Sequence, residues 1–102
     1  MQHSALEFIL HIRDETEFCL QQLAEKTYDS FISDAVLSRA IVRSLEIIGE
    51  ASKHIPTDFQ VKYPLIEWKV MAGMRDRLMG LSESMEFLFK FRHLMKNRYL
   101  WR

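Results

Sequence analysis

The sequence predicts an all-α protein, folded as an antiparallel bundle of four to five helices. The chain of 102 residues contains only 3 Gly and 2 Pro, while 48% of its residues are hydrophobic, which is typical of long helices with few turns. Apolar residues also recur at steps of three and four over most of the chain, so that they share a helical face. The length suits one domain, residues 1–102, which is small enough to profit from oligomerisation.

The first predicted helix covers residues 4–25. Its apolar face consists of residues at successive spacings of 3, 4, 3 and 4, namely Ile9, Ile12, Thr16, Cys19 and Leu23. A polar break at residues 26–30 ends this helix. The second predicted helix begins near Asp34, a competent N-cap, and extends to about His54.

This second helix carries an apolar stripe and a charged stripe. The apolar stripe consists of Leu37, Ile41, Leu45, Ile48 and Ile55, and the charged stripe consists of Arg39, Arg43, Glu46, Glu50 and Lys53. Charged residues at these spacings are typical of a solvated face with weak ion pairs. On so apolar a helix they also fit a polar seam that faces a partner subunit or lines a cleft. Both interpretations remain open.

Pro56 and Pro64 bracket a predicted loop at residues 56–65, because proline is excluded from helix interiors. A shorter helix is predicted at residues 67–79, with an apolar side made of Trp68, Met71, Met74 and Leu78. Gly80 is placed to end this helix. The last predicted helix covers residues 82–101.

Charge is distributed unevenly, and the last helix is basic. Residues 1–58 hold 10 acidic and 5 basic residues, whereas residues 59–102 hold 4 acidic and 9 basic residues. Basic and aromatic residues interleave in the tail: Lys90, Arg92, His93, Lys96, Arg98 and Arg102 with Phe89, Phe91, Tyr99 and Trp101. This pattern is compatible with binding to single-stranded nucleic acid or to a membrane surface. The simpler interpretation places the aromatic rings in the core and the basic groups in solvent.

The sequence offers few signs of a membrane, a cofactor or a metal. No run of eighteen apolar residues occurs, and the single Cys19 fits a reducing cytoplasm, where we expect it to be a buried small side chain. Glu7, His11 and Glu15 share a helical face, but a di-metal site in a bundle needs Glu-x-x-His motifs on two helices. We therefore interpret these three residues as a charged surface and expect neither a metal nor a cofactor.

Two segments resemble a known family. The segment DAVLSRAIVRSLEIIGEASKHIP, residues 34–56, is similar to the signature helix of the HepT-like family within the HEPN superfamily. The segment YPLIEWKVMAGMRDRLM, residues 63–79, resembles the next family element in order and spacing. The resemblance covers about residues 1–79, and residues 80–102 diverge from it.

The resemblance implies a cytoplasmic, all-helical homodimer with metal-independent ribonuclease activity, the toxin of a type VII toxin–antitoxin pair. The implied antitoxin is a minimal nucleotidyltransferase that adds AMP to a tyrosine of the active-site motif, and the implied substrate is RNA. The motif is an arginine, four to six residues, a histidine, any residue and a tyrosine. By this resemblance the catalytic positions are Arg75 and Asp76, and the cleft-lining positions are Arg39, Arg43, Glu46 and Arg77.

The chain departs from the family motif directly after these residues. The histidine position falls on Gly80, Leu81 or Ser82, and the tyrosine position falls on Ser82, Glu83 or Ser84. Neither side chain of the histidine–tyrosine pair is present, so we predict a catalytically impaired ribonuclease. The alternatives are a non-catalytic helical dimer that binds the antitoxin or RNA, and a structural remnant that dimerises and binds nothing.

A change of reading frame is one hypothesis for the departure. The family commonly has Val-Trp after its motif, and the codons of Met85 and Glu86, read one base later, include TGG for tryptophan. A small deletion near codon 80 would explain this, and deliberate inactivation of a lethal toxin is the alternative origin. The DNA sequence around codon 80 distinguishes the two.

Overall fold

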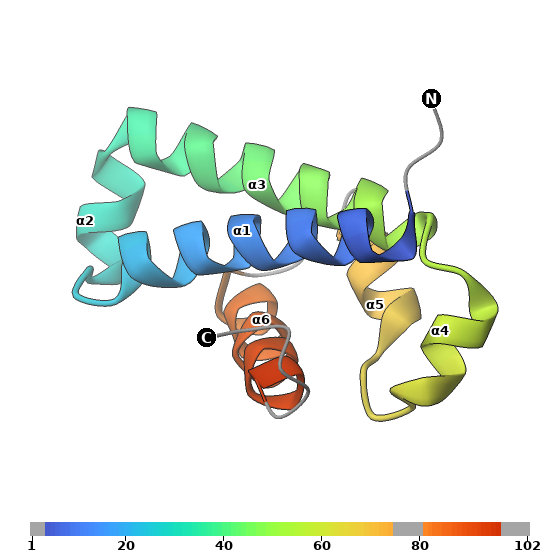
Figure 1. The fold of residues 1–102 in the computed structure, drawn as a ribbon. Coiled ribbons are helices and arrows are strands. Elements are labelled where there is room, and N and C mark those ends of the chain that lie inside the picture. Colours follow the sequence, from blue (N-terminus) through green and yellow to red (C-terminus); the bar gives the residue numbers. More distant parts are fainter. Residues whose placement is uncertain (1–3, 75–80, 97–102) are drawn as a thin grey trace.

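The computed structural model describes residues 4–74 and 81–96 (Figure 1). The described residues form helices and no strands, which confirms the all-α prediction. In chain order the helices are α1 (Ala5–Leu23), α2 (Tyr28–Ser33), α3 (Ala35–Lys53), α4 (Thr57–Lys62), α5 (Trp68–Gly73) and α6 (Leu81–Lys96).

Helices α1 and α3 run antiparallel and form the most extensive helix pair of the described chain (Figure 1). Each begins at a side-chain cap. The Ser4 hydroxyl accepts a hydrogen bond from the Glu7 amide, and the Glu7 carboxylate accepts one from the Ser4 amide. Asp34 Oδ1 accepts a hydrogen bond of 2.9 Å from the Leu37 amide. The predicted start of the second long helix is therefore confirmed.

Two short helices occupy segments that were predicted to lack helix. Helix α2 begins within the expected polar break and extends past it. The helix can start there because Thr27 and Ser30 cap each other: the side chain of each accepts a hydrogen bond from the amide of the other. Helix α4 lies in the expected loop. Pro56 precedes it as the N-cap residue, with φ −62° and ψ 149°, so the proline is compatible with the helix that it was expected to prevent.

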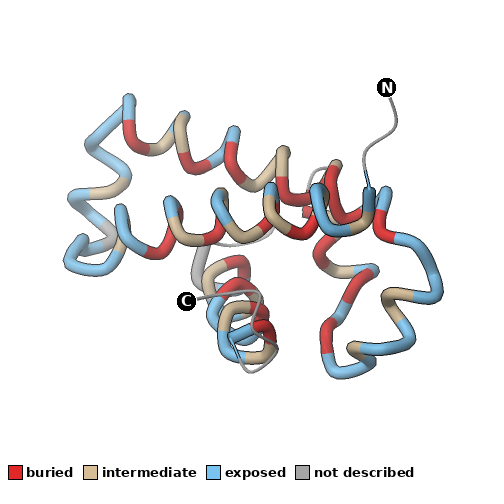
Figure 2. The backbone as a smooth tube through the Cα atoms, in the orientation of Figure 1, coloured by how far each residue is buried: buried red, intermediate tan, exposed pale blue. Residues whose placement is uncertain are grey.

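The core lies between the α1–α3 pair and the later helices (Figure 2). Helices α5 and α6 lie on the same side of that pair, and α6 is viewed almost end-on beneath it (Figure 1). Trp68 of α5 meets Phe91 of α6 edge to face, with ring centroids 6.4 Å apart. The buried apolar side chains are supplied mainly by Ile9, Ile12, Cys19, Leu20, Leu37, Ile41, Ile48, Ile55, Ile66, Trp68, Met71, Met74, Leu88, Phe91 and Met95.

The described portion of the last predicted helix forms α6 and packs onto the bundle. Leu88, Phe91 and Met95 of α6 are buried, while Lys90 and Lys96 are exposed. The Arg92 guanidinium reaches Glu17 of α1 at 3.5 Å. The placement of the aromatic rings in the core is therefore confirmed for Phe91 and wrong for Phe89, which is 52% exposed, while Lys90, His93 and Lys96 are exposed as expected. Arg98, Tyr99, Trp101 and Arg102 lie outside the described residues. No helix in the described part of the chain is both long and apolar enough to cross a bilayer.

Candidate functional site

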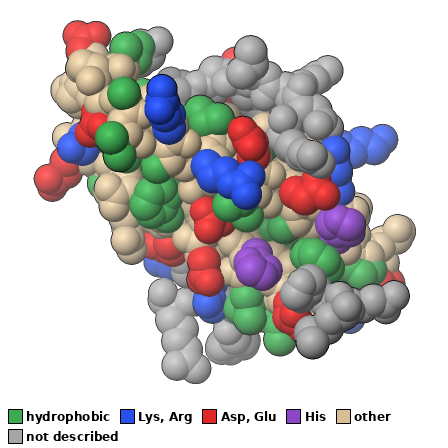
Figure 3. Space-filling view, turned by 90° about the horizontal axis from the view of Figure 1, so that it is seen from above, with side chains coloured by type: hydrophobic (Ala, Val, Ile, Leu, Met, Phe, Trp, Pro, Cys, Tyr) green, Lys and Arg blue, Asp and Glu red, His purple; other side chains and the backbone are tan. Residues whose placement is uncertain are grey.

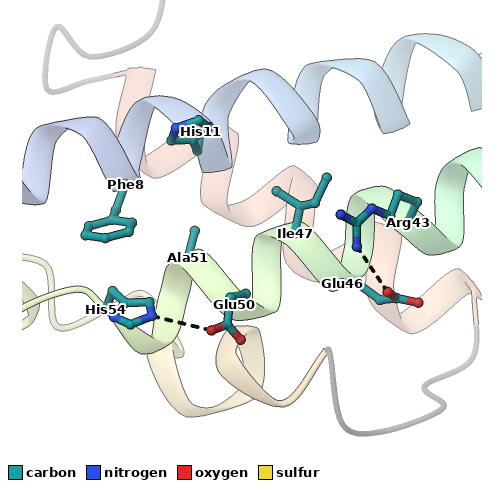
Figure 4. A pocket seen from close by; sticks show the side chains of 8 residues that line it. All are labelled: Phe8, His11, Arg43, Glu46, Ile47, Glu50, Ala51 and His54. Atoms are coloured by element: carbon teal, nitrogen blue, oxygen red, sulfur yellow. Dashed lines mark hydrogen bonds and ion pairs between the residues drawn. The ribbon is translucent and has the colours of Figure 1, made fainter. Parts of the chain in front are cut away.

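An open pocket of about 360 Å³ lies between the first half of α1 and the second half of α3 (Figure 4). The pocket lies at the end of the antiparallel pair where the carboxyl end of α3 is beside the amino end of α1. Its described lining consists of Phe8, His11, Arg43, Glu46, Ile47, Glu50, Ala51 and His54. The pocket therefore combines one arginine, two carboxylates and two imidazoles over an apolar floor.

The α3 side of the pocket is the charged stripe. Arg43 Nη1 lies 3.5 Å from Glu46 Oε2, one helical turn away, and both side chains remain substantially exposed. Glu50 follows one turn later and lies 3.4 Å from His54 Nε2. Arg43, Glu46 and Glu50 thus line a pocket, which fits the cleft-lining interpretation of the stripe. Arg39 is exposed on the same stripe, one turn before the pocket begins.

The α1 side contributes an aromatic wall and a second imidazole. The Phe8 ring stacks on the His54 ring, with centroids 5.1 Å apart and planes 14° from parallel (Figure 4). His11 lies one turn further along α1 and lines the same pocket. Phe8 and His54 were not predicted as site residues, because their meeting depends on how α1 packs against α3.

The balance of charge decides which ligands suit the pocket. Arg43 carries one positive charge, and Glu46 and Glu50 carry one negative charge each, so the described lining has a formal charge of −1 when both histidines are neutral. A polyanion gains little from such a surface, because the carboxylates oppose the arginine. A cation or a hydrogen-bond donor fits the α3 end of the pocket better.

A small polar cluster joins α1 to α3, in which Ser44 and Cys19 are buried and Glu15 is half-buried. Ser44 Oγ donates a hydrogen bond of 2.8 Å to Glu15 Oε1, which joins the two helices. Burial raises the pKa of the Cys19 thiol to about 11, against a lowering by its hydrogen bond with Ser44 and with a further rise from Glu15. Cys19 is therefore a protonated, buried thiol at neutral pH, as its position on the apolar stripe predicted.

The residues of the suspected metal face have other partners. Glu7 caps α1 and Glu15 accepts from Ser44, while His11 lines the pocket. Among residues 4–74 and 81–96, no group of three or more His, Cys, Asp or Glu side chains is arranged to hold a metal ion.

The motif positions themselves fall mostly outside the described residues. Arg75, Asp76, Arg77 and Gly80 are among the residues that the structure does not describe. Their placement relative to the pocket therefore remains a prediction. Helix α6 begins at Leu81, so the later motif positions belong to its first turn, where Glu83 is exposed and Ser84 is buried.

Fold and site together define a small all-α protein with an open, charged pocket between its two 19-residue helices. Its sequence matches the family described as Ribonuclease HepT-like over residues 8–80. The chain therefore belongs to the HepT-like ribonuclease family.

Individual relatives agree with this assignment. A "Putative RNase" of Caldanaerobacter subterraneus subsp. tengcongensis is 46% identical over 71 residues, and one of Methanocaldococcus jannaschii is 41% identical over 71 residues. Each alignment covers 70% of this chain but only 63% and 59% of the respective relative. The "Probable ribonuclease HepT" of Thermococcus cleftensis is 40% identical over 78 residues, which are 76% of this chain and 71% of that protein. No solved structure matches the chain.

Proposed function

We propose that the chain derives from the toxin of a type VII toxin–antitoxin pair and is a metal-independent endoribonuclease whose incomplete motif leaves it weakly active or inactive. One observation carries the proposal: the family match ends at residue 80, and residues 80–84 contain neither histidine nor tyrosine. The retained motif residues are Arg75 and Asp76.

The chemistry explains why this loss matters. In metal-independent cleavage the ribose 2′-oxygen attacks the adjacent phosphorus, and the 5′-oxygen leaves. A base takes the proton of the 2′-hydroxyl, an acid protonates the departing oxygen, and a cation stabilises the charge on the phosphorane. Arginine suits the phosphate because its planar fork donates paired hydrogen bonds. Arg75 is retained for that role, while the proton-transferring histidine is absent from the motif.

The same departure affects the proposed partners. A minimal nucleotidyltransferase that adds AMP to the motif tyrosine has no tyrosine to modify at residues 82–84 of this chain. The proposed setting is the cytoplasm, the proposed substrate is RNA, and the proposed assembly is a homodimer. The departure at codon 80 also supports a change of reading frame, which the DNA sequence tests directly.

The test restores the motif and measures RNA cleavage in the presence of a chelator. Leu81→His with Glu83→Tyr reproduces the family spacing after Arg75, and it places the tyrosine where the native side chain is exposed rather than at buried Ser84. We expect this variant to cleave about 10²–10⁴ times faster than the natural chain, the usual contribution of general acid–base catalysis. Arg75→Ala in the same background should remove the gain.

Two results would contradict the proposal. Rapid cleavage by the natural chain that survives Arg75→Ala would place the activity in other residues. A folded Leu81→His/Glu83→Tyr variant with no gain would show that the missing pair is not what limits activity.

A second candidate is a non-catalytic helical dimer that binds the antitoxin or RNA. The retained Arg75 and Arg77 in the sequence favour it. Arg39 and Arg43 add positive charge on α3, which Glu46 and Glu50 beside them largely offset. Co-purification with a minimal nucleotidyltransferase, or RNA binding whose affinity falls as salt rises, supports this candidate. If neither occurs, the chain is a structural remnant.

A further inference from the structure

The second half of α6 carries a basic surface that is separate from the candidate site. Residues 87–96, FLFKFRHLMK, contain three basic residues and one histidine and no acidic residue. One side of this segment is buried in the core through Leu88, Phe91 and Met95. Basic residues near the carboxyl end of a helix complement its dipole, so their charge alone does not require a ligand.

Phe89 places an aromatic ring on this basic surface. The residue is 52% exposed, whereas Phe91 is 1% exposed. The guanidinium carbon of Arg92 lies 5.3 Å from the centroid of the Phe89 ring, which is a cation–π contact. Arg92 also reaches Glu17 of α1 at 3.5 Å, so it connects the ring to the bundle. Phe89 is therefore held beside a fixed cation while about half of it remains exposed.

Further basic side chains lie beside this ring. His93 and Lys96 are exposed and follow Phe89 at helical spacings of four and three, so all three share one face of α6. This face extends about 10 Å along the helix axis. Lys90 is exposed next to the ring and lies 3.8 Å from Glu67, in a pair whose side chains are each about half exposed. Such a pair is weak, so Lys90 can exchange this carboxylate for another anion.

The opposite face of the molecule is less suited to an anion. Helix α6 lies beneath the α1–α3 pair in Figure 1, and the view from above in Figure 3 shows acidic, basic and histidine side chains interspersed. On that side Arg43 lies 3.5 Å from Glu46. The acid-free segment of α6 is therefore the better surface for a polyanion.

The ring decides which polyanion fits. A membrane surface requires a helix with a free apolar side, but the apolar side of α6 is used by the core, and Phe89 is the large apolar side chain exposed on its described part. A nucleic-acid duplex keeps the faces of its bases inside the stack. A single strand offers both phosphates and open base faces, which are the two groups that basic and aromatic side chains bind together.

We propose that the second half of α6 binds single-stranded RNA, with a base stacked on Phe89 and phosphates beside Lys90, His93 and Lys96. The inference rests on the proposed function, which supplies RNA as the partner; the surface is new. It lies beyond residue 80, where the match to the family ends. This chain would therefore hold RNA with a segment that the family match does not include.

Substitution of the ring tests the stacking. The probe is a fluorescein-labelled, 2′-O-methylated oligouridine of about 12 nucleotides, which cannot be cleaved because its 2′-oxygen is blocked. Phe89→Ala should raise the dissociation constant about 5- to 100-fold, measured by fluorescence anisotropy, the usual loss for one stacked base. Phe89→Leu keeps an apolar side chain without the ring and should also weaken binding. The matched control is Phe18→Ala, which removes a ring of α1 that is 36% exposed and should leave the dissociation constant unchanged.

Two further variants test the charges. Lys96→Gln should lower the slope of log affinity against log salt by about 0.7, the value for one phosphate of a single strand. Its control is Lys62→Gln at an exposed position of α4, which should keep the slope. Glu67→Gln removes the carboxylate that competes for Lys90, and it should strengthen binding about two- to fivefold. Circular dichroism should show native helix content in every variant.

The inference is overturned by a folded Phe89→Ala variant that binds as tightly as the natural chain. It is also overturned if an RNA duplex binds as tightly as the single strand, or if vesicles rich in phosphatidylserine bind the chain through Phe89. Cleavage of unmodified RNA is a separate readout. Phe89-dependent binding without cleavage would overturn the proposed ribonuclease and keep this surface, whereas cleavage without such binding would overturn this surface and keep the ribonuclease.

Discussion

The ring of Phe8 stacks on the imidazole of His54, with centroids 5.1 Å apart and planes inclined by 14°. The contact joins the beginning of α1 to the residue that ends α3, and it closes one end of the pocket. Phe8 and His54 therefore connect α1 to α3 and also line the pocket.

A double-mutant cycle measures this stacking. Phe8→Ala and His54→Ala should each lower the free energy of unfolding, and the coupling between them should be about 0.5–1.5 kcal/mol, the usual value for stacked rings beyond their buried area. Urea denaturation of the four proteins provides the measurement. Strictly additive losses would mean that the stacking itself contributes nothing.

Thr16 offers a stabilising substitution. Its hydroxyl is fully buried and has no hydrogen-bond partner among the residues that the structure describes. Thr16→Val removes the unsatisfied polar group and keeps the shape, so we expect the free energy of unfolding to rise by about 1–2 kcal/mol. Thr16→Ser keeps the hydroxyl and loses a methyl group, and it should be destabilising. A less stable valine variant would show that the hydroxyl is satisfied in solution.

The buried Cys19 should make stability depend on alkaline pH. Its pKa rises from 9.0 to about 11 on folding, so between these values the folded state retains a proton that the unfolded state releases. Its contribution is complete below pH 9 and is lost as the pH rises towards 11, by about 2–3 kcal/mol in total. Urea unfolding of the natural chain and of Cys19→Ala across this range measures the difference. Equal slopes for the two proteins would contradict the burial of the thiol.

The Asp34 cap predicts a smaller effect. Asp34→Ala removes the acceptor of the Leu37 amide at the start of α3 and should cost about 1 kcal/mol of unfolding free energy. Asp34→Asn retains a side-chain oxygen at the same place and should cost much less. The thermal midpoints of the three proteins, measured by circular dichroism, test this order.

The long helices were predictable from the sequence because periodicity and caps act locally. The apolar steps from Ile9 to Cys19 and the cap at Asp34 locate α1 and α3 to within about two residues. The short helices were missed for a related reason. Six residues give too little periodicity, and the reciprocal Thr27–Ser30 cap has serine where the usual capping box has Glu or Gln.

The candidate site was predictable only in part. The charged stripe follows from spacing along one helix, and three of its residues, Arg43, Glu46 and Glu50, line the pocket. Phe8 and His54 join them only because α1 packs antiparallel to α3, a tertiary relationship that no local pattern contains. One signal was available: His54 follows Glu50 by four residues, which places both on the same face as the stripe.

Helix α6 lies beyond the stretch that matches the family, yet Leu88, Phe91 and Met95 complete the core beneath α1 and α5. A core requires apolar volume at helical spacing, whereas a catalytic motif requires particular side chains at particular positions. The segment after residue 80 can therefore lack the histidine and tyrosine of the motif and still contribute side chains to the core. Because Trp68 packs edge to face on Phe91 of α6, part of the core of the family-matching stretch is covered by a segment that lies outside that stretch.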